Sequence, residues 1–83
     1  MANRKIDTLP LEWVRVFEAA GRVGSFTAAA QECGLTQAAV SQRIRNLEER
    51  IGTNLFSRQA RGVTLTVDGE AWLPYVKIGR AHV

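Results

Sequence analysis

The sequence predicts a small, mainly α-helical domain with a two-stranded hairpin, and three observations support this fold class. Apolar residues in the segment 37–50 recur at the helical period, and a short turn containing Gly34 separates this segment from an earlier helical one. After Gly52 the period changes to two β-type runs, 55–58 and 63–66. A hairpin directly after a helix-turn-helix is typical of a winged helix-turn-helix, here with a three-helix core, a two-stranded wing and the start of a linker helix.

The first two helices follow from their apolar faces and their end residues. Thr8 can cap the first helix, Pro10 is tolerated in its first turn, and Gly21 or Gly24 ends it. Its broad apolar face is formed by Trp13, Val14, Val16, Phe17 and Ala20. The second helix is expected to begin after Ser25 as N-cap and to end at a left-handed Gly34. Its inward-facing residues are Phe26, Ala29 and Ala30.

The third helix is expected over residues 37–50, capped by Thr36 and ended by Gly52, with Leu35 buried in the preceding turn. Its apolar stripe consists of Val40, Ile44, Leu47 and Ile51. The polar turn "QARG" joins the strands of the wing and carries Gln59 and Arg61 at its tip. A fourth helix then starts after Thr66 as N-cap, with Asp68 and Glu70 in its first turn and Pro74 expected to kink or weaken it.

Length and composition set the class of protein. The 83 residues suffice for one small domain, and an apolar content of 46% permits a compact core. No apolar run approaches the roughly 20 residues that cross a bilayer, and the first ten residues lack a secretory signal. The single cysteine, Cys33, cannot form an internal disulfide and is expected to be a small buried thiol. These features favour a reducing cytoplasm and no membrane.

The positive charge is concentrated in one part of the chain. The formal net charge is +3, and the charges cancel both before Thr36 and after Thr66. Between these two residues five arginines face only Glu48 and Glu49. The arginines are Arg43, Arg45, Arg50, Arg58 and Arg61. A local basic region in a small domain favours a polyanionic partner, nucleic acid first.

The start of the third helix has the chemistry of a base-reading surface. Gln37 offers a donor and an acceptor and can pair with adenine, for example, while Ala38 permits close approach and can contact a thymine methyl. Ser41 and Gln42 can contact a base or a phosphate, and Arg45 can reach guanine or phosphate. The alternative is an ordinary solvated surface, in which Arg45 forms helical ion pairs with Glu48 and Glu49. Arg43 and Arg50 are expected to contact phosphate or to be plain surface.

Further contacts are expected beside this helix. Ser25 and Thr27 at the start of the second helix can donate to a phosphate, although Ser25 can also be a simple N-cap. In the wing, Arg61 suits the narrow minor groove of A·T-rich DNA, and Arg58 is expected to contact phosphate.

An enzyme is not predicted. The sequence has no plausible histidine–nucleophile pair, no glycine-rich phosphate loop, no paired carboxylate site and no Cys/His metal cluster. Two other functions stay open: a winged helix used for protein–protein contact, and a nonspecific architectural DNA-binding protein. The first would lack the polar start of the third helix and the wing arginines, and selection on random DNA distinguishes the second.

Several linked motifs then carry a family resemblance over roughly residues 9–76. They are "TQAAVS" at 36–41, "IRNLE" at 44–48, "LFSR" at 55–58 and "LTVDG" at 65–69, after an alanine-rich second helix. In this order they resemble the N-terminal DNA-binding domain of LysR-type transcriptional regulators, which are bacterial. "LEWVRVFEAA" resembles the first helix of the subgroup that includes the glycine-cleavage activator.

The resemblance implies sequence-specific binding of double-stranded DNA, with the third helix in the major groove and a wing arginine in the minor groove. The positions that it marks are Gln37, Ala38, Ser41, Gln42 and the wing-tip Arg61, and Thr36 joins them as the start of the recognition motif. It also implies a homodimer on an inverted-repeat operator, paired through the fourth helix by Ala71, Trp72, Leu73 and Val76.

The resemblance also divides the chain. Residues 1–66 are expected to form the DNA-binding domain and residues 67–77 a truncated linker helix. Dimers of this chain are therefore expected to be weak or absent, and exposed Trp72 is expected to promote aggregation. The effector-binding domain of the family is expected to be absent, and no cofactor is predicted. Residues 78–83, "IGRAHV", break the helical pattern and can be encoded by a common short-read sequencing adapter, so they are predicted to be a non-native tail.

Overall fold

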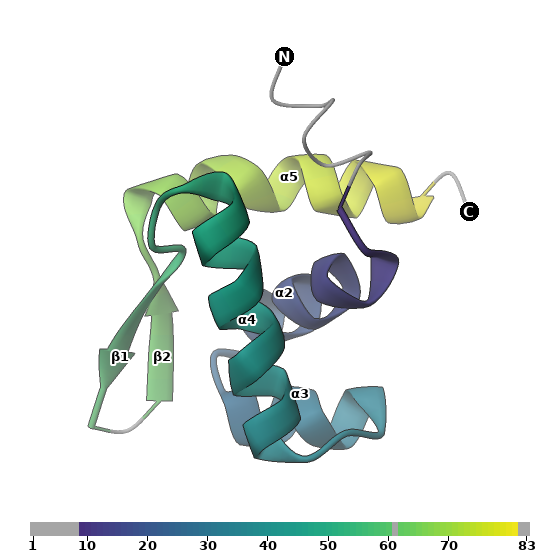
Figure 1. The fold of residues 1–83 in the computed structure, drawn as a ribbon, viewed down its shortest axis with the longest axis vertical. Coiled ribbons are helices and arrows are strands. Elements are labelled where there is room, and N and C mark those ends of the chain that lie inside the picture. The colour runs from purple at the N-terminus through teal and green to yellow at the C-terminus, as the bar shows by residue number, and fades with distance from the viewer. Residues whose placement is uncertain (1–8, 61, 82–83) are drawn as a thin grey trace.

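The structure, a computed structural model, describes residues 9–60 and 62–81, with side chains through residue 74. Its elements follow in the order α2 (Leu11–Val23), α3 (Phe26–Cys33), α4 (Gln37–Ile51), β1 (Phe56–Gln59), β2 (Gly62–Leu65) and α5 (Val67–Ala81). Figure 1 shows α4 upright, with the β1–β2 wing to its left and α3 at its N-terminal end, while α5 crosses the top of the view and packs against α2. This arrangement confirms the predicted winged helix-turn-helix.

Capping residues set the ends of the first three helices. Helix α2 begins directly after Pro10, whose carbonyl accepts from the amides of Trp13 and Val14, so Pro10 precedes the first turn instead of lying in it. Thr8 lies outside the described residues. Helices α3 and α4 begin as predicted, because the hydroxyls of Ser25 and Thr36 each accept a backbone N–H three residues later. The last turns of α2, α3 and α4 end at left-handed glycines, Gly24, Gly34 and Gly52.

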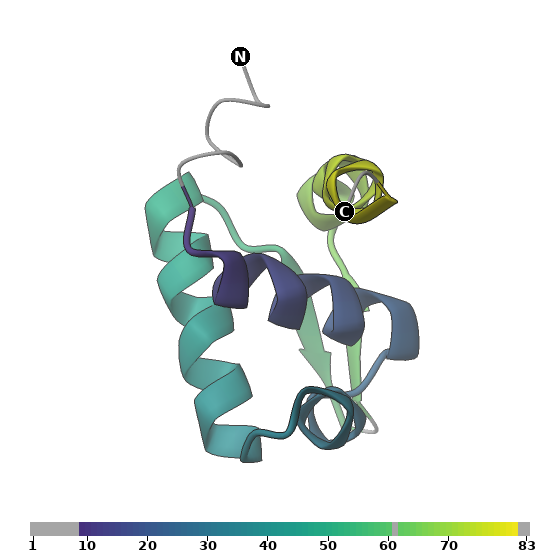
Figure 2. The ribbon, with the colours of Figure 1, turned by 90° about the vertical axis from the view of Figure 1, so that its right-hand side faces the viewer.

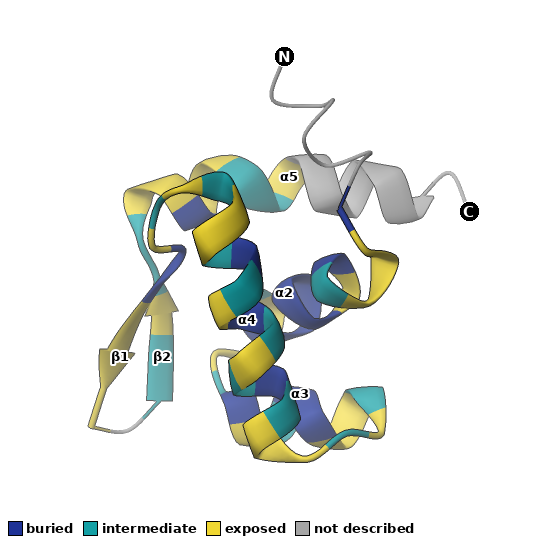
Figure 3. Ribbon diagram, in the orientation of Figure 1, coloured by how far each residue is buried: buried dark blue, intermediate teal, exposed yellow. Residues whose placement is uncertain are grey.

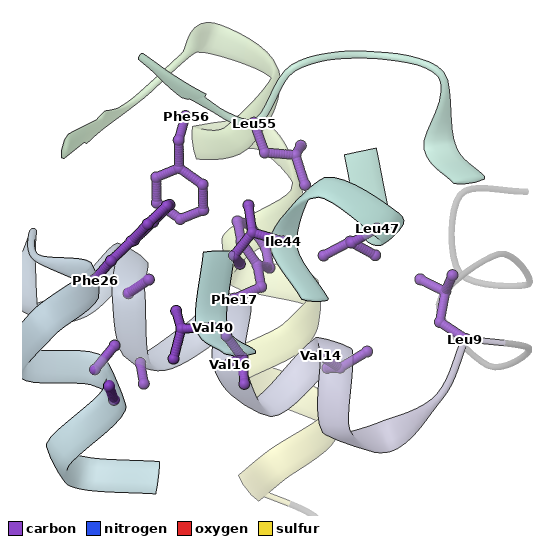
Figure 4. Packing of buried hydrophobic residues seen from close by; sticks show 14 residues of the cluster. Leu9, Val14, Val16, Phe17, Phe26, Val40, Ile44, Leu47, Leu55 and Phe56 are labelled. Atoms are coloured by element: carbon purple, nitrogen blue, oxygen red, sulfur yellow. The ribbon is translucent and has the colours of Figure 1, made fainter. Parts of the chain in front are cut away.

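The core lies where α2, α3 and α4 meet the root of the wing (Figure 4). The stripe of α4 is confirmed, since Val40, Ile44 and Leu47 are buried and Ile51 is half-buried against them. The ring of Phe56 in β1 stands edge-on to Phe17 at 5.7 Å and to Phe26 at 5.3 Å between centroids. Such pairs contribute about 0.5–1.5 kcal/mol each beyond their area, so β1 is attached to both α2 and α3. Leu35 and Cys33 are half-buried, not fully buried as expected.

An ion-paired cluster connects α2 to α3. Arg22 pairs with Glu18 one turn before it, at 3.0 Å, and with Glu32 of α3. Glu18 is the one buried charged residue in the described part of the chain. The hydrogen bonds to Glu32 and to Glu18 raise the pKa of Arg22 further above its ordinary value, so its charge persists at every pH at which the protein folds. This cluster fixes the α2–α3 angle. Figure 2 shows that angle from the side.

The wing is shifted by one residue from the predicted runs. β1 and β2 are antiparallel, with Phe56 opposite Leu65 and Gln59 opposite Gly62. Leu55 precedes the ladder, and its amide donates to Glu48 instead of to β2. Gln59 is therefore the last residue of β1, not part of the tip as predicted, and Arg61 lies outside the described residues.

Helix α5 begins where the wing ends. The predicted N-cap is confirmed, since the hydroxyl of Thr66 accepts from the amide of Gly69 at 3.1 Å. The helix includes Pro74 and runs through Ala81, so the expected break in helical pattern at Ile78 is wrong. A proline removes one helical hydrogen bond and crowds the carbonyl four residues before it, yet α5 continues through Pro74 without a break. The source of residues 78–83 stays a prediction.

Candidate nucleic-acid interface

The N-termini of α3 and α4 lie together beside the wing and carry polar residues, and Figure 3 shows that much of this part of the ribbon is exposed. On α4, the exposed residues Gln37, Ala38, Gln42 and Arg45 and the half-buried Ser41 fall within the first nine residues of the helix. Positions 38, 41, 42 and 45 are three or four residues apart, so they share one side of the helix. The structure therefore brings the predicted base-reading residues together on an accessible face.

Two hydrogen bonds orient the glutamine amides of this surface. The hydroxyl of Thr27 in α3 donates to Oε1 of Gln37 at 3.1 Å. The Nε2 group of Gln42 donates to Oδ1 of Asn46, one turn later, at 2.9 Å. The amide nitrogen of Gln37 and the amide oxygen of Gln42 therefore lie opposite the atoms used in these bonds. Sequence reasoning assigned Thr27 to a phosphate and missed that its hydroxyl also reaches Gln37.

A groove of about 440 Å³ separates the helix N-termini from the wing. Its lining comes from α3, α4 and both strands: Ser25, Phe26, Thr27, Gln37, Arg58, Gln59, Ala60, Gly62 and Val63. The guanidinium carbon of Arg58 lies 5.1 Å from the centre of the Phe26 ring. This cation–π contact holds the exposed Arg58 side chain along the groove while its N–H groups stay available.

The other arginines of α4 differ from the predictions. Arg43 was expected at a phosphate or on plain surface, but its guanidinium pairs with Glu12 of α2 and donates to the carbonyl of Ala39 at 3.2 Å. Arg50 lies over the Trp13 ring of α2, 5.4 Å from its centre. Both cations therefore connect α4 to α2. This outcome corrects both expectations, because sequence spacing on one helix does not show which side a second helix covers.

Arg45 stands apart from these contacts. Its expected ion pair with Glu48 is not observed, because Oε2 of Glu48 instead accepts the backbone amides of Leu55 at 2.8 Å and Phe56 at 3.2 Å. Among the residues that the structure describes, no acidic side chain forms an ion pair with Arg45. Its charge is therefore available to a ligand. The contact of Glu48 with the wing had no sequence signal, since a glutamate three residues after an arginine is typical of a helical pair.

The residues predicted for dimerisation do not share one environment. Ala71 is exposed, whereas Trp72 and Leu73 are half-buried and pack against the core of their own chain. The expectation of an exposed Trp72 is therefore wrong, because its side chain packs half-buried against the core. The side chain of Val76 lies outside the described residues.

Within 9–60 and 62–81 no group of three or more His, Cys, Asp or Glu side chains is placed to hold a metal ion. No described helix has both the length and the apolar character needed to span a membrane.

Comparison with known proteins identifies a family for this arrangement. The sequence model described as "Bacterial regulatory helix-turn-helix protein, lysR family" matches residues 11–70. The transcriptional activator AmpR of Pseudomonas aeruginosa is 54% identical over 66 residues, which are 80% of this chain and 22% of that protein. This chain spans about a quarter of the length of the curated relatives it matches.

Solved structures agree with the sequence comparison. A complex of the BenM DNA-binding domain with benA site 1 DNA superposes with a TM-score of 0.84 at 32% identity, covering 89% of this chain and 83% of that one. The full-length CbnR structure with its target DNA gives a TM-score of 0.81 at 26% identity, covering 89% of this chain and 27% of that one. The narrower resemblance of residues 11–20 to the glycine-cleavage-activator subgroup stays a prediction.

Proposed function

Because the chain belongs to the LysR family of bacterial regulatory helix-turn-helix proteins, we propose that it binds double-stranded DNA sequence-specifically. In this proposal α4 enters the major groove, and the wing follows the backbone and places Arg61 in the minor groove. The observation that carries the proposal is the accessible start of α4, where Gln37, Ala38 and Gln42 are exposed on one surface beside the groove of Arg58. Two structural neighbours are, by their descriptions, complexes with DNA.

The hydrogen bonds within this surface support different base contacts for Gln37 and Gln42. Since Oε1 of Gln37 already accepts from Thr27, its amide nitrogen is the group left to meet an acceptor on a base edge. Guanine O6 and N7 and thymine O4 are such acceptors. Since Nε2 of Gln42 donates to Asn46, its amide oxygen is placed to meet the amino group of adenine or cytosine. The adenine pairing suggested for Gln37 is thus better suited to Gln42.

Contacts to the DNA backbone are proposed for two hydroxyl groups and two arginines. Ser25 and Thr36 cap their helices with hydroxyl oxygens, and each hydroxyl keeps its hydrogen to donate to a phosphate. Arg58 and Arg45 supply positive charge on either side of the reading surface. These hydroxyls and charges position the protein, while the glutamines distinguish sequences.

We further propose that the regulator acts in the bacterial cytoplasm as a homodimer on an inverted repeat, paired through α5. Trp72 and Leu73 are largely engaged with the core of their own chain, so Ala71 and the later turns of α5 are left for the partner. Analytical ultracentrifugation that gives only monomer at high protein concentration would remove the dimer from the proposal for this chain.

Selection of binding sites from random duplex DNA, followed by a salt titration, tests the proposed function. We expect a two-fold-related motif rich in A·T. Arg58→Ala should reduce the slope of log K against log salt by about 0.9, the value for one lost phosphate contact. Arg50→Ala is the matched control, because Arg50 carries the same charge but lies over Trp13. An absence of any enriched motif would favour nonspecific architectural binding, and an absence of binding would favour protein–protein contact.

A further inference from the structure

The carboxylate of Glu48 joins the end of the recognition helix α4 to the root of the wing. Its Oε2 atom accepts from two consecutive backbone amides, those of Leu55 at 2.8 Å and Phe56 at 3.2 Å. Hydrogen bonds to an ionised acceptor are about twice as strong as those between neutral groups. A single side chain of α4 therefore holds the first residue of β1 and the residue before it.

These two amides belong to the best-buried part of the wing. Leu55 is fully buried, and Phe56 is the first residue of β1, paired with Leu65 of β2. An isolated two-stranded hairpin is marginally stable at best in water, so this wing depends on contacts at its root. The side chain of Phe56 supplies one such contact with Phe17 and Phe26, and Glu48 supplies the backbone contact.

The same segment also carries α5. The carbonyl of Leu55 accepts from the amide of Thr66 at 3.0 Å, and the hydroxyl of Thr66 donates to the carbonyl of Asn54 at 2.7 Å. Helix α5 then passes so close that a Cβ atom on Gly69 would lie 2.2 Å from the Leu55 carbonyl oxygen. The peptide groups of residues 54–56 thus contact α4, β2 and α5 at once.

We propose that Glu48 is a positioning residue for DNA binding, which fixes the wing at its working distance from the reading surface of α4. This inference rests on the proposed function. Arg58 lies only two residues after Phe56 and lines the groove opposite Gln37. If the root of β1 is free to tilt, the charge of Arg58 remains but its position relative to the helix N-termini is no longer defined. Glu48 acts through the wing and does not itself contact the DNA.

Glu49 provides a matched control on the same helix. It carries the same charge as Glu48, is exposed, and forms no hydrogen bond or ion pair with another residue in the described part of the chain. Replacing either glutamate by glutamine changes the net charge equally. Any difference between the two variants therefore reports on the contact with the wing and not on general attraction to DNA.

The experiment combines Glu48→Gln, Glu49→Gln and Arg58→Ala in a double-mutant cycle on a duplex chosen by site selection. We expect Glu48→Gln to bind the duplex about fivefold more weakly than Glu49→Gln does, which is the size of effect found for residues that act together. Arg58→Ala should weaken binding about tenfold in the unchanged chain and in Glu49→Gln, but only about twofold in Glu48→Gln. Amide exchange at Leu55 and Phe56 should also become faster in Glu48→Gln alone.

Equal penalties for Arg58→Ala in both glutamine variants would overturn the proposal, whatever the change in amide exchange, and would leave Glu48 a structural residue only. If Glu48→Gln does not fold, Glu48→Asp replaces it, because aspartate keeps the charge and shortens the side chain. Arg58→Ala is then expected to weaken binding only about twofold in the Glu48→Asp background. Failure of the unchanged chain to select any site would instead remove the proposed function, and that result does not depend on any variant of Glu48.

Discussion

Helix α4 has two polar sides with similar residues and different surroundings. On one side Arg43 and Arg50 are engaged by Glu12 and Trp13 of α2. On the other side Arg45 is exposed, and it forms no ion pair among the described residues. It lies three residues after Gln42, on the side of the helix that also carries the reading residues. The difference teaches that the side covered by α2 stabilises the fold with its cations, whereas the side left open has cations available for a polyanion.

The largest effect is expected from the apolar stripe between these two sides. Ile44 is fully buried in the centre of α4. Ile44→Ala should lower the free energy of unfolding by about 2–5 kcal/mol, because it removes buried methyl groups and leaves a cavity. Urea denaturation followed by circular dichroism measures the loss. The base preference of the protein that remains folded should not change, and a loss below about 1 kcal/mol would show that the stripe is not the core of the domain.

A smaller and different effect is expected on the open side. Gln42→Ala should cost about 1–3 kcal/mol of binding on the selected site and relax the preference at one base-pair position. Its stability should stay within about 0.5 kcal/mol of the unchanged chain, since the side-chain bond that it loses among the described residues is the exposed one to Asn46. Repeating site selection with the variant checks this prediction. An unchanged motif and affinity would place the reading surface elsewhere.

The smallest effects are expected from Arg43 and Arg45, which lie on opposite sides of α4. Arg43→Ala should reduce stability by no more than about 1 kcal/mol, because its pair with Glu12 is partly exposed and therefore screened. Its effect on DNA binding should be small. Arg45→Ala should do the reverse, leaving stability unchanged and reducing the salt slope by about 0.9. Thermal melts and salt titrations of both variants test this pairing. The same result for both would contradict the assignment of sides.

The elements of the fold were predictable because each has a local cause. Ser25 and Thr36 as caps, Gly34 in a left-handed turn and the stripe through Ile44 depend on neighbours within one or two turns. The shift of the wing by one residue was not predictable, because it arises when Leu55 gives its amide to Glu48, seven residues away on a helix. The partners of Arg43 and Arg50 lie on α2, more than 30 residues earlier in the chain.

In the candidate site too, the residue types were predictable from the sequence, and the contacts between distant segments were not. The residue types at the start of α4 predicted a reading surface, and the structure places them together there. The orientation of their amides was not predictable, since Thr27 reaches Gln37 only after the turn at Gly34 has set the angle between α3 and α4. Trp72 and Leu73 resemble interface residues in sequence because nothing in their neighbourhood shows that α5 folds back on the core.

Gly69 has a consequence for how such a chain changes over evolutionary time. The approach of α5 to the Leu55 carbonyl leaves no room for a side chain at this position, so the direction in which α5 leaves the wing is set by main chain against main chain. Substitutions on the exposed surface of α5 can then accumulate without altering that path. A saturation library at residue 69 should therefore retain glycine alone, while the neighbouring exposed position Glu70 accepts many side chains.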